Sequence, residues 1–158
     1  MPTVLLEGLT YADAAYVARR LREWDAKEIM PLVFGGAEDL AFIAANAQYG
    51  KVALFDGEPV AVVGASQVVR TVWQPFMFAT DKWPKVALSV TRHIKRVMVP
   101  LWFESGANRA ECRTHHQYKW AHRWLETLGA RKEAVLEEYG SGRETYFLYV
   151  WRRSFYEV

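Results

Sequence analysis

The stretch from Trp73 to Gly129 constrains the fold more than any other part of the chain. Its hydrophobic pattern alternates strands with helices, in the order strand Thr71–Ala79, loop Thr80–Lys85, helix from Val86, strand Arg109–Thr114 and helix Tyr118–Leu128. A strand that leads through a loop into a helix presents unpaired N–H groups at the positive end of the helix dipole, which suits an anion such as a phosphate. Basic residues follow on that loop and helix, at Lys82, Lys85, Arg92, Lys95 and Arg96.

Composition narrows the class of protein. The 158 residues suit one domain, here 1–158, and 51% hydrophobic with 24% charged residues indicates a globular chain. A net charge of +2 argues against a protein built mainly to bind nucleic acid. One cysteine excludes an internal disulfide and fits a reducing cytoplasm. Neither a membrane-span-length apolar run nor a signal-peptide pattern is evident, so we expect a cytoplasmic protein without a membrane partner.

The first part of the chain predicts a strand followed by two helices. Pro2–Leu9 is a short apolar run, and Thr10 is placed as the N-cap of one helix that continues to Met30. Apolar residues recur along it at helical spacing, at Ala14, Val17, Ala18, Leu21 and Trp24. Asp25 and Glu28 lie three residues apart near the edge of that stripe. A second, shorter helix is expected over Glu38–Gln48.

A hairpin and a further strand follow. Lys51–Phe55 and Pro59–Ser66 are strands joined by Asp56-Gly57-Glu58, and Asp-Gly between apolar runs is a strong hairpin signal. The next strand, which ends at Ala79, contains Pro75, which lacks an N–H and so predicts a bulge or a splay. Splayed strands leave a gap that a ligand chain can enter.

The last part predicts two more strands, Arg131–Glu138 and Glu144–Val150, around a glycine-rich turn. The whole order mixes hairpins with crossovers. It therefore predicts an α/β (α+β) domain with a mixed, mostly antiparallel central sheet and helices on both faces.

This order of elements resembles the GNAT acyltransferase superfamily over nearly the whole chain. The ending His122–Ala130 resembles the helix that closes on Leu-Gly in that family. Four segments are also similar to a GNAT-like group of tailed phages, itself similar to internal virion protein A of short-tailed phages: Arg22–Ile29, Phe55–Pro59, Phe78–Thr80 and Arg123–Leu125.

The resemblance implies splayed central strands that hold acetyl-CoA, with an amine as acceptor. It assigns the thioester and pantetheine to backbone amides near Phe78 and Thr80, and the phosphates to Lys82, Lys85 and Arg92. The alternative for these cations is a solvated basic face. The loop departs from the family because it has no glycine, and Trp83 and Pro84 would crowd a pyrophosphate, although the lysines can act as point charges. The family's general-acid tyrosine corresponds to Leu125 here.

Acyl transfer to an amine needs a base and an acid. Glu28 is the favoured base and Asp25 the second, because desolvation beside an apolar stripe raises a carboxyl pKa. Tyr118 is the candidate acid. The alternatives are solvated carboxylates near a helix end and an aromatic ring that packs at a helix start.

The remaining reactive residues predict no metal site. His115, His116, His122 and Cys112 are close in sequence, but zinc needs four ligands in fixed geometry, and strand alternation separates the cysteine from His115. Cys112 also lacks an activating partner for a role as nucleophile. Trp120 and Trp124 are interpreted as core or interface residues on one helix face.

Two functions stay open at this point. The first is an acyl-CoA-dependent N-acetyltransferase, encoded by a phage, that transfers an acetyl group to an unknown amine in the host cytoplasm. The second is a degenerate GNAT-fold protein that acts in virion assembly or binds a host protein. The missing glycines and Leu125 favour the second, and the tail Trp151–Val158 offers a surface for a homo-oligomer.

Overall fold

A seven-stranded sheet in the order β1-β2-β3-β4-β5-β7-β6 forms the centre of the computed structural model, which describes residues 3–157. The strands are β1 (Val4–Gly8), β2 (Tyr49–Phe55), β3 (Glu58–Val69), β4 (Val72–Ala79), β5 (Arg109–His115), β6 (Arg131–Leu136) and β7 (Tyr146–Arg152). Neighbouring strands pair antiparallel except β4 and β5, which are parallel. The expected mixed, mostly antiparallel sheet is confirmed.

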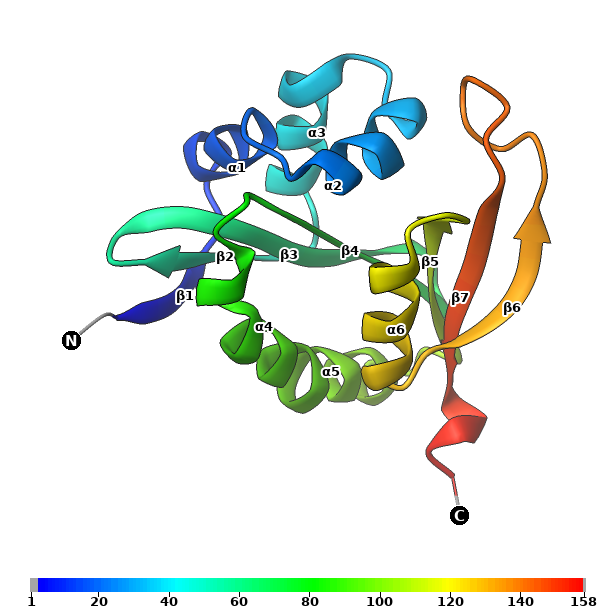
Figure 1. Cartoon of the computed structure of the whole chain (residues 1–158). Coiled ribbons are helices and arrows are strands. Elements are labelled where there is room, and N and C mark those ends of the chain that lie inside the picture. Colours follow the sequence, from blue (N-terminus) through cyan, green and yellow to red (C-terminus); the bar gives the residue numbers. More distant parts are fainter. Residues whose placement is uncertain (1–2, 158) are drawn as a thin grey trace.

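Helices cover both faces of this sheet (Figure 1). One face carries α1 (Tyr11–Ala18), α2 (Glu23–Ile29) and α3 (Gly36–Ala45), and the other carries α4 (Ala87–His93), α5 (Val99–Glu104) and α6 (Lys119–Thr127). A π-helical segment, Ile94–Met98, joins α4 to α5, so the helix expected from Val86 forms and extends to Glu104. Within residues 3–157, no helix is long and apolar enough to cross a lipid bilayer.

The hairpin between β2 and β3 forms where the sequence predicts it. Asp56 and Gly57 have φ values of 48° and 82°, the left-handed pair that a tight two-residue hairpin needs. Gly129 follows α6 with φ 98°, which is the usual left-handed helix ending.

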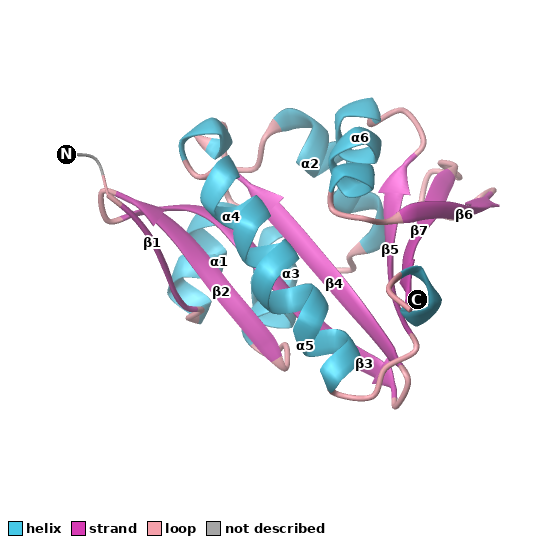
Figure 2. Ribbon diagram, turned by 90° about the horizontal axis from the view of Figure 1, so that it is seen from below, coloured by secondary structure: helices cyan, strands magenta, loops and turns pink. Residues whose placement is uncertain are grey.

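Strands β4 and β5 separate after two paired positions, Val72 with Arg109 and Trp73 with Ala110. Figure 2 shows the two strands diverging toward their carboxyl ends. Pro75 lies just beyond the last paired position and still matches Ala65 of β3 in register. Thr80 N–H donates to Val60 O, and antiparallel alternation from that pair turns the backbone nitrogen of Pro75 away from β3 and toward the splay. The absence of an N–H group at Pro75 therefore removes no hydrogen bond between β3 and β4. The predicted splay is found here, whereas the irregular register in this hairpin lies between Gln67 and Val69.

The single helix expected from Thr10 to Met30 is wrong, because the chain breaks between α1 and α2. Leu21 forms an isolated bridge with Thr80, and Arg22 N–H donates to Ala79 O at 2.9 Å. The backbone at Leu21 and Arg22 thus joins the end of β4 instead of continuing the helix. Both residues are good helix formers, so local propensity contains no sign of the break. The break directs α2 across the splay.

The expected helix over Glu38–Gln48 is shifted, because α3 begins at Gly36 and ends at Ala45. Two hydrophobic cores then sandwich the sheet. The larger core lies under α4, α5 and α6 and includes Trp73, Trp102 and Trp151. The smaller core lies under α1 and α3 and includes Val17, Val62 and Phe78.

Candidate functional site

A cavity of about 420 Å³ occupies the splay between β4 and β5, a size within the usual range for small-molecule sites. Its lining comes from both faces of the sheet. On the side of α4 to α6 it is lined by Ile94, Met98, Trp102, Leu125, Leu128 and Trp151. On the side of α2 and α3 it is lined by Ile29, Leu32, Val33, Ile43, Phe76 and Phe78. The walls are largely apolar, so the few polar groups that face the cavity decide its chemistry.

The backbone edge of β4 supplies donors to this space. Alternation along the β3–β4 pair directs the N–H groups of Met77 and Ala79 toward the splay, and those of Phe76 and Phe78 toward β3. Ala79 N–H donates to Asp25 Oδ2 at 2.8 Å. Met77 lines the cavity and its N–H points into the splay, so this N–H can donate a hydrogen bond to a developing oxyanion there.

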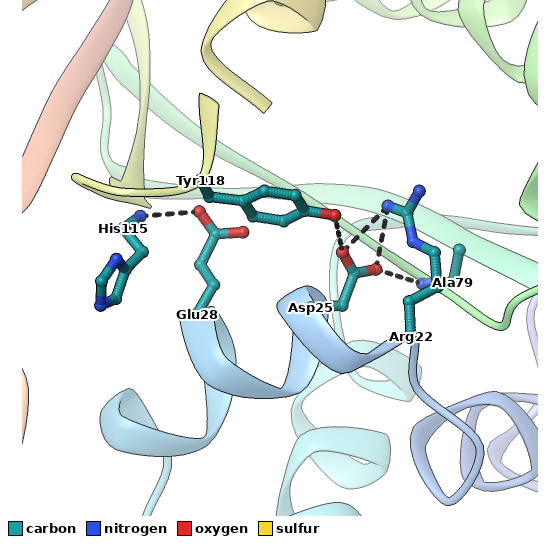
Figure 3. A network of polar contacts seen from close by, with 6 residues as sticks. All are labelled: Arg22, Asp25, Glu28, Ala79, His115 and Tyr118. Atoms are coloured by element: carbon teal, nitrogen blue, oxygen red, sulfur yellow. Dashed lines mark hydrogen bonds and ion pairs between the residues drawn. The ribbon is translucent and has the colours of Figure 1, made fainter. Parts of the chain in front are cut away.

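Asp25 fixes α2 to the end of β4 (Figure 3). Besides Ala79 N–H, its carboxylate accepts from Arg22 Nη2 at 2.9 and 3.1 Å and from the Tyr118 hydroxyl at 2.7 Å. The residue is 2% exposed. Both carboxylate oxygens are thus occupied by charged or buried donors, which makes Asp25 a strong structural anchor.

Glu28 lies one helical turn further along α2 and reaches β5. Its Oε1 accepts from His115 N–H at 2.9 Å (Figure 3). The residue as a whole is partly buried, but burial of the carboxyl group raises its pKa to about 7, against the opposing effects of Thr114 and of the His115 N–H. A carboxyl group with this pKa in a largely apolar cavity is suited to take up a proton at neutral pH.

The Tyr118 hydroxyl group is bound to Asp25 and so is not directed at a ligand in the cavity. Its hydroxyl donates to Asp25, and its ring stacks on Trp24 with centroids 5.6 Å apart. Burial and the Asp25 charge raise its pKa far above the ordinary value. The expectation that Tyr118 is the acid thus requires the hydroxyl to leave Asp25.

Comparison with known proteins gives a fold but no sequence relative. No family model and no curated protein matches the sequence. The structure is similar to that of Ard1 from Thermoplasma volcanium, with TM-score 0.73 and 15% identity over 94% of this chain and 97% of that chain. It is similar to the ribosomal-protein-S18-alanine N-acetyltransferase from Escherichia coli, with TM-score 0.70 and 14% identity over 95% and 94%. A GNAT-family acetyltransferase from Bacillus anthracis matches with TM-score 0.65 and 13% identity over 96% and 95%.

This chain has the GNAT fold. Identities this low show a shared fold rather than a shared activity, so the chemistry has to be argued from the residues present. The expectation of splayed central strands with a cavity between them is met by the GNAT architecture of this chain.

The loop after β4 differs from a glycine-rich phosphate cradle. Trp83–Lys85 forms a 3-10 turn, closed by hydrogen bonds from Trp83 N–H to Thr80 O and from Val86 N–H to Trp83 O. Thr80 N–H is bonded to Val60 O, and the Thr80 hydroxyl accepts from Lys82 N–H. The expected amide donor at Thr80 therefore points into the sheet.

The predicted phosphate-binding cations lie outside the cavity. Lys82 pairs with Glu58 at 2.6 Å, and both side chains are exposed. Lys85 lies over the ring of Phe55, with Nζ 5.7 Å from the centroid, and Arg92 is exposed on α4. Phe78 lines the cavity, but its side chain belongs to the core under α1 and α3. Lys82 and Lys85 therefore lie together in the turn after β4, whereas Arg92 lies apart from them, on α4.

An aromatic cluster closes the space between this turn and α6. Trp83 is 5% exposed and meets the edges of Trp120 and Trp124 at centroid distances of 5.9 and 5.5 Å. The Arg22 guanidinium lies 4.5 Å from the Trp120 centroid, and Trp124 Nε1–H donates to Thr91 Oγ1 at 3.1 Å, which ties α6 to α4. Crowding of the turn by Trp83 is thus observed, yet a cavity remains beside Phe78.

Sequence reasoning missed several residues that line the cavity. Within residues 3–157, buried side-chain nitrogens without a hydrogen-bond partner include Nε of Arg22, Nε1 of Trp102 and Nε of Arg113, and all three residues line the cavity. Their positions depend on tertiary packing, and no local motif marks them. The i, i+4 spacing of Trp120 and Trp124 was the one available signal for the aromatic cluster.

His115, the last residue of β5, and its neighbour His116 form a stacked pair. His115 stacks on His116, with ring centroids 4.9 Å apart, and His115 Nδ1 accepts from Gln117 N–H. Across residues 3–157 no group of three histidine, cysteine or acidic side chains is placed to hold a metal ion. Burial raises the pKa of Cys112 to about 12, so its thiol stays protonated at neutral pH.

Proposed function

We propose that the protein is an acyl-CoA-dependent N-acyltransferase that uses acetyl-CoA or a related thioester and an amine acceptor. The observation that carries this proposal is Glu28, whose pKa is about 7 and which faces an apolar cavity in the splay of a GNAT fold. The structurally similar proteins include N-acetyltransferases, which supports the reaction type without showing it. The acceptor stays unidentified.

The proposed step uses groups on both strands. The acceptor nitrogen forms a bond to the thioester carbonyl carbon, and its proton passes to the Glu28 carboxylate. Met77 N–H stabilises the negative charge that develops on the carbonyl oxygen, because it points into the same space. The C–S bond then breaks, and the leaving thiolate takes a proton from solvent or from Tyr118. The products are an amide and the free thiol.

Binding of acetyl-CoA requires one site for its thioester arm and another for its diphosphate. The thioester arm suits the cavity, which is apolar and about 420 Å³ in volume. The diphosphate has no glycine cradle, so we assign it to the exposed cations Lys82, Lys85 and Arg92 acting as point charges. Occupation of the whole path also requires the cluster of Trp83, Trp120 and Trp124 to move apart.

Calorimetric titration with acetyl-CoA tests binding. We expect affinity in the micromolar range, and about tenfold weaker binding in a Lys82→Ala, Lys85→Ala double variant, since each lost phosphate contact removes part of the electrostatic attraction. Absence of heat from a folded sample contradicts the proposal.

Glu28→Gln tests the chemistry in a thiol-release assay with a panel of amines. The wild-type rate should rise with pH through about 7 as Glu28 ionises, and the variant should lose about 10²–10⁴ in rate and this pH dependence. Full activity in Glu28→Gln excludes Glu28 as the base. Asp25→Asn is the matched comparison on the same helix, because the Asp25 carboxylate is occupied by hydrogen bonds and is not expected to act as the base.

A non-catalytic role is the second candidate, and the tryptophan closure beside the glycine-free loop favours it. In that case the GNAT fold serves as a binding module in virion assembly or against a host protein, as the resemblance to the phage group suggests. Phage origin and virion localisation remain proposals. So does an oligomer through the tail, although the tail expected from Trp151 begins only after Arg152, because Trp151 is buried in β7. A protein that binds no acyl-CoA and releases no thiol would support this second role.

A further inference from the structure

The cavity extends away from Glu28 into an inner chamber beneath β4 and β5. We define the inner chamber by Met98, Trp102, Leu125, Leu128 and Trp151, which line its walls. These residues are between 0% and 7% exposed, so the chamber lies inside the larger core. Protein interiors seldom leave such space between large side chains, because packing normally fills it.

The chamber is deep in comparison with an acetyl group. His115, whose N–H binds Glu28, pairs with Tyr146, and Ala110 pairs with Trp151 at the other end of β5. These two positions are five residues apart, which corresponds to roughly 16 Å at about 3.3 Å per residue. Trp102 lies at the far end, where its ring meets Trp151 at a centroid distance of 5.2 Å. The acceptor nitrogen lies between Glu28 and the carbonyl carbon, at about 3 Å from each, and takes up about 6 Å of this length. About 10 Å remain beyond the carbonyl carbon, of which an acetyl group fills only about 1.5 Å and a chain of six to eight carbons fills roughly 6–9 Å.

The side chains that line the inner chamber are apolar, apart from the indole N–H of Trp102 at the far end. Leu125 and Leu128 follow one another along α6 and its end, and both line the cavity with apolar side chains. Trp102 is fully buried, and its Nε1–H has no hydrogen-bond partner. A chamber with hydrocarbon walls and a single terminal donor suits a hydrocarbon chain that ends near an oxygen atom.

We propose that the thioester substrate carries a medium-chain acyl group of about six to eight carbons, which the inner chamber binds and whose far end Trp102 contacts. This inference rests on the proposed acyl-transfer function and names its donor class. The bond changes are those given above: the acyl C–S bond breaks, the C–N bond forms, and Glu28 takes the amine proton. The donor differs from acetyl-CoA only in the length of the acyl chain beyond the carbonyl group.

A chain-length series tests the proposal by calorimetry with acetyl-, butyryl-, hexanoyl- and octanoyl-CoA. Each methylene that leaves water for an apolar wall contributes about fourfold in affinity. Hexanoyl-CoA has four more methylenes than acetyl-CoA, so we expect it to bind about 250-fold tighter.

Two substitutions of one wall residue should move the optimum in opposite directions. Leu128→Trp shortens the chamber, so the advantage of hexanoyl-CoA over acetyl-CoA should disappear or reverse. Leu128→Ala lengthens the chamber, so the preferred chain should grow by about two carbons. Far-ultraviolet circular dichroism establishes that both variants are folded before titration.

The donor at the far end is tested by a matched pair of ligands, hexanoyl-CoA and 6-hydroxyhexanoyl-CoA. Wild-type protein should prefer the hydroxylated chain by about fivefold, as expected for one net hydrogen bond, and Trp102→Phe should lose that preference. Loss of binding to both ligands in a folded Trp102→Phe sample would contradict the assigned contact.

The outcomes separate this inference from the proposed function. If acetyl-CoA binds and longer chains bind equally or more weakly, the inner chamber does not hold an acyl chain, while the transferase proposal stands. If no acyl-CoA of any length binds to folded protein, both proposals fail together.

Discussion

Removal of the Asp25 carboxylate should destabilise the protein more than removal of any exposed charge. Asp25 accepts hydrogen bonds from Arg22, Ala79 and Tyr118, which belong to the start of α2, the end of β4 and the start of α6. Asp25→Ala leaves the Ala79 N–H and the Tyr118 hydroxyl without an acceptor and the Arg22 guanidinium without its counter-charge. The three elements that border the splay lose their common partner.

The expected size follows from burial. Breaking a buried ion pair costs about 3–5 kcal/mol. The Arg22 side chain is 14% exposed and so regains some water, which places Asp25→Ala near the lower end, at about 3 kcal/mol. For a chain of this length that corresponds to a fall in melting temperature of about 6–12 °C. Asp25→Asn keeps the shape and one acceptor oxygen but loses the charge, so we expect about half of this loss.

Urea unfolding followed by tryptophan fluorescence measures these differences. Glu23→Ala is the matched control on the same helix, because Glu23 pairs with Lys27 at 3.0 Å with side chains 79% and 51% exposed. Such a pair contributes less than about 0.5 kcal/mol. If Asp25→Ala lowers the free energy of unfolding no more than Glu23→Ala does, Asp25 does not anchor α2 across the splay.

Two further stability predictions follow from the structure. The pKa of Glu28 is raised from 4.5 to about 7 on folding, so the stabilising contribution of its protonated carboxyl group is complete below pH 4.5 and is lost as pH rises through 7. Between pH 4.5 and pH 8 the wild type should lose about 1–3 kcal/mol of unfolding free energy relative to Glu28→Gln, as measured by urea unfolding at both pH values. An equal change in wild type and Glu28→Gln would contradict the raised pKa. A Cβ at Gly64 would clash with Tyr49 O and would lie 2.6 Å from the Phe76 ring, so Gly64→Ala should cost about 2 kcal/mol or more. Gly8→Ala has nothing within 4 Å of its Cβ and should be nearly neutral, and thermal melts of both variants measure the difference.

Local sequence patterns predicted most of the framework. The Asp-Gly hairpin, the strands on either side of it and the final helix with its glycine ending depend on backbone preferences and periodicity over a few residues. Pro75 also marked the splay correctly, because a missing N–H is tolerated only where no strand needs it. The sequence likewise placed Asp25 and Glu28 together near an apolar stripe.

Tertiary contacts decided what the two carboxylates do. Asp25 and Glu28 look alike in the sequence, but Asp25 meets Ala79 and Tyr118, which are 54 and 93 residues away, and so becomes an anchor. Glu28 meets His115, 87 residues away, through one oxygen, and burial raises its pKa. No short-range pattern contains this distinction, because partners so distant in the chain are set by the packing of the whole sheet.

The loop after β4 shows the same division. The sequence determined that it would lack glycine and carry two lysines, a tryptophan and a proline. Only the folded structure decided that Trp83 turns inward against α6 while Lys82 turns outward to Glu58. Side-chain direction in a turn depends on which neighbours are available to cover an indole ring and to pair an ammonium group. Those neighbours come from α6 and β3, which the turn meets only after the chain has folded.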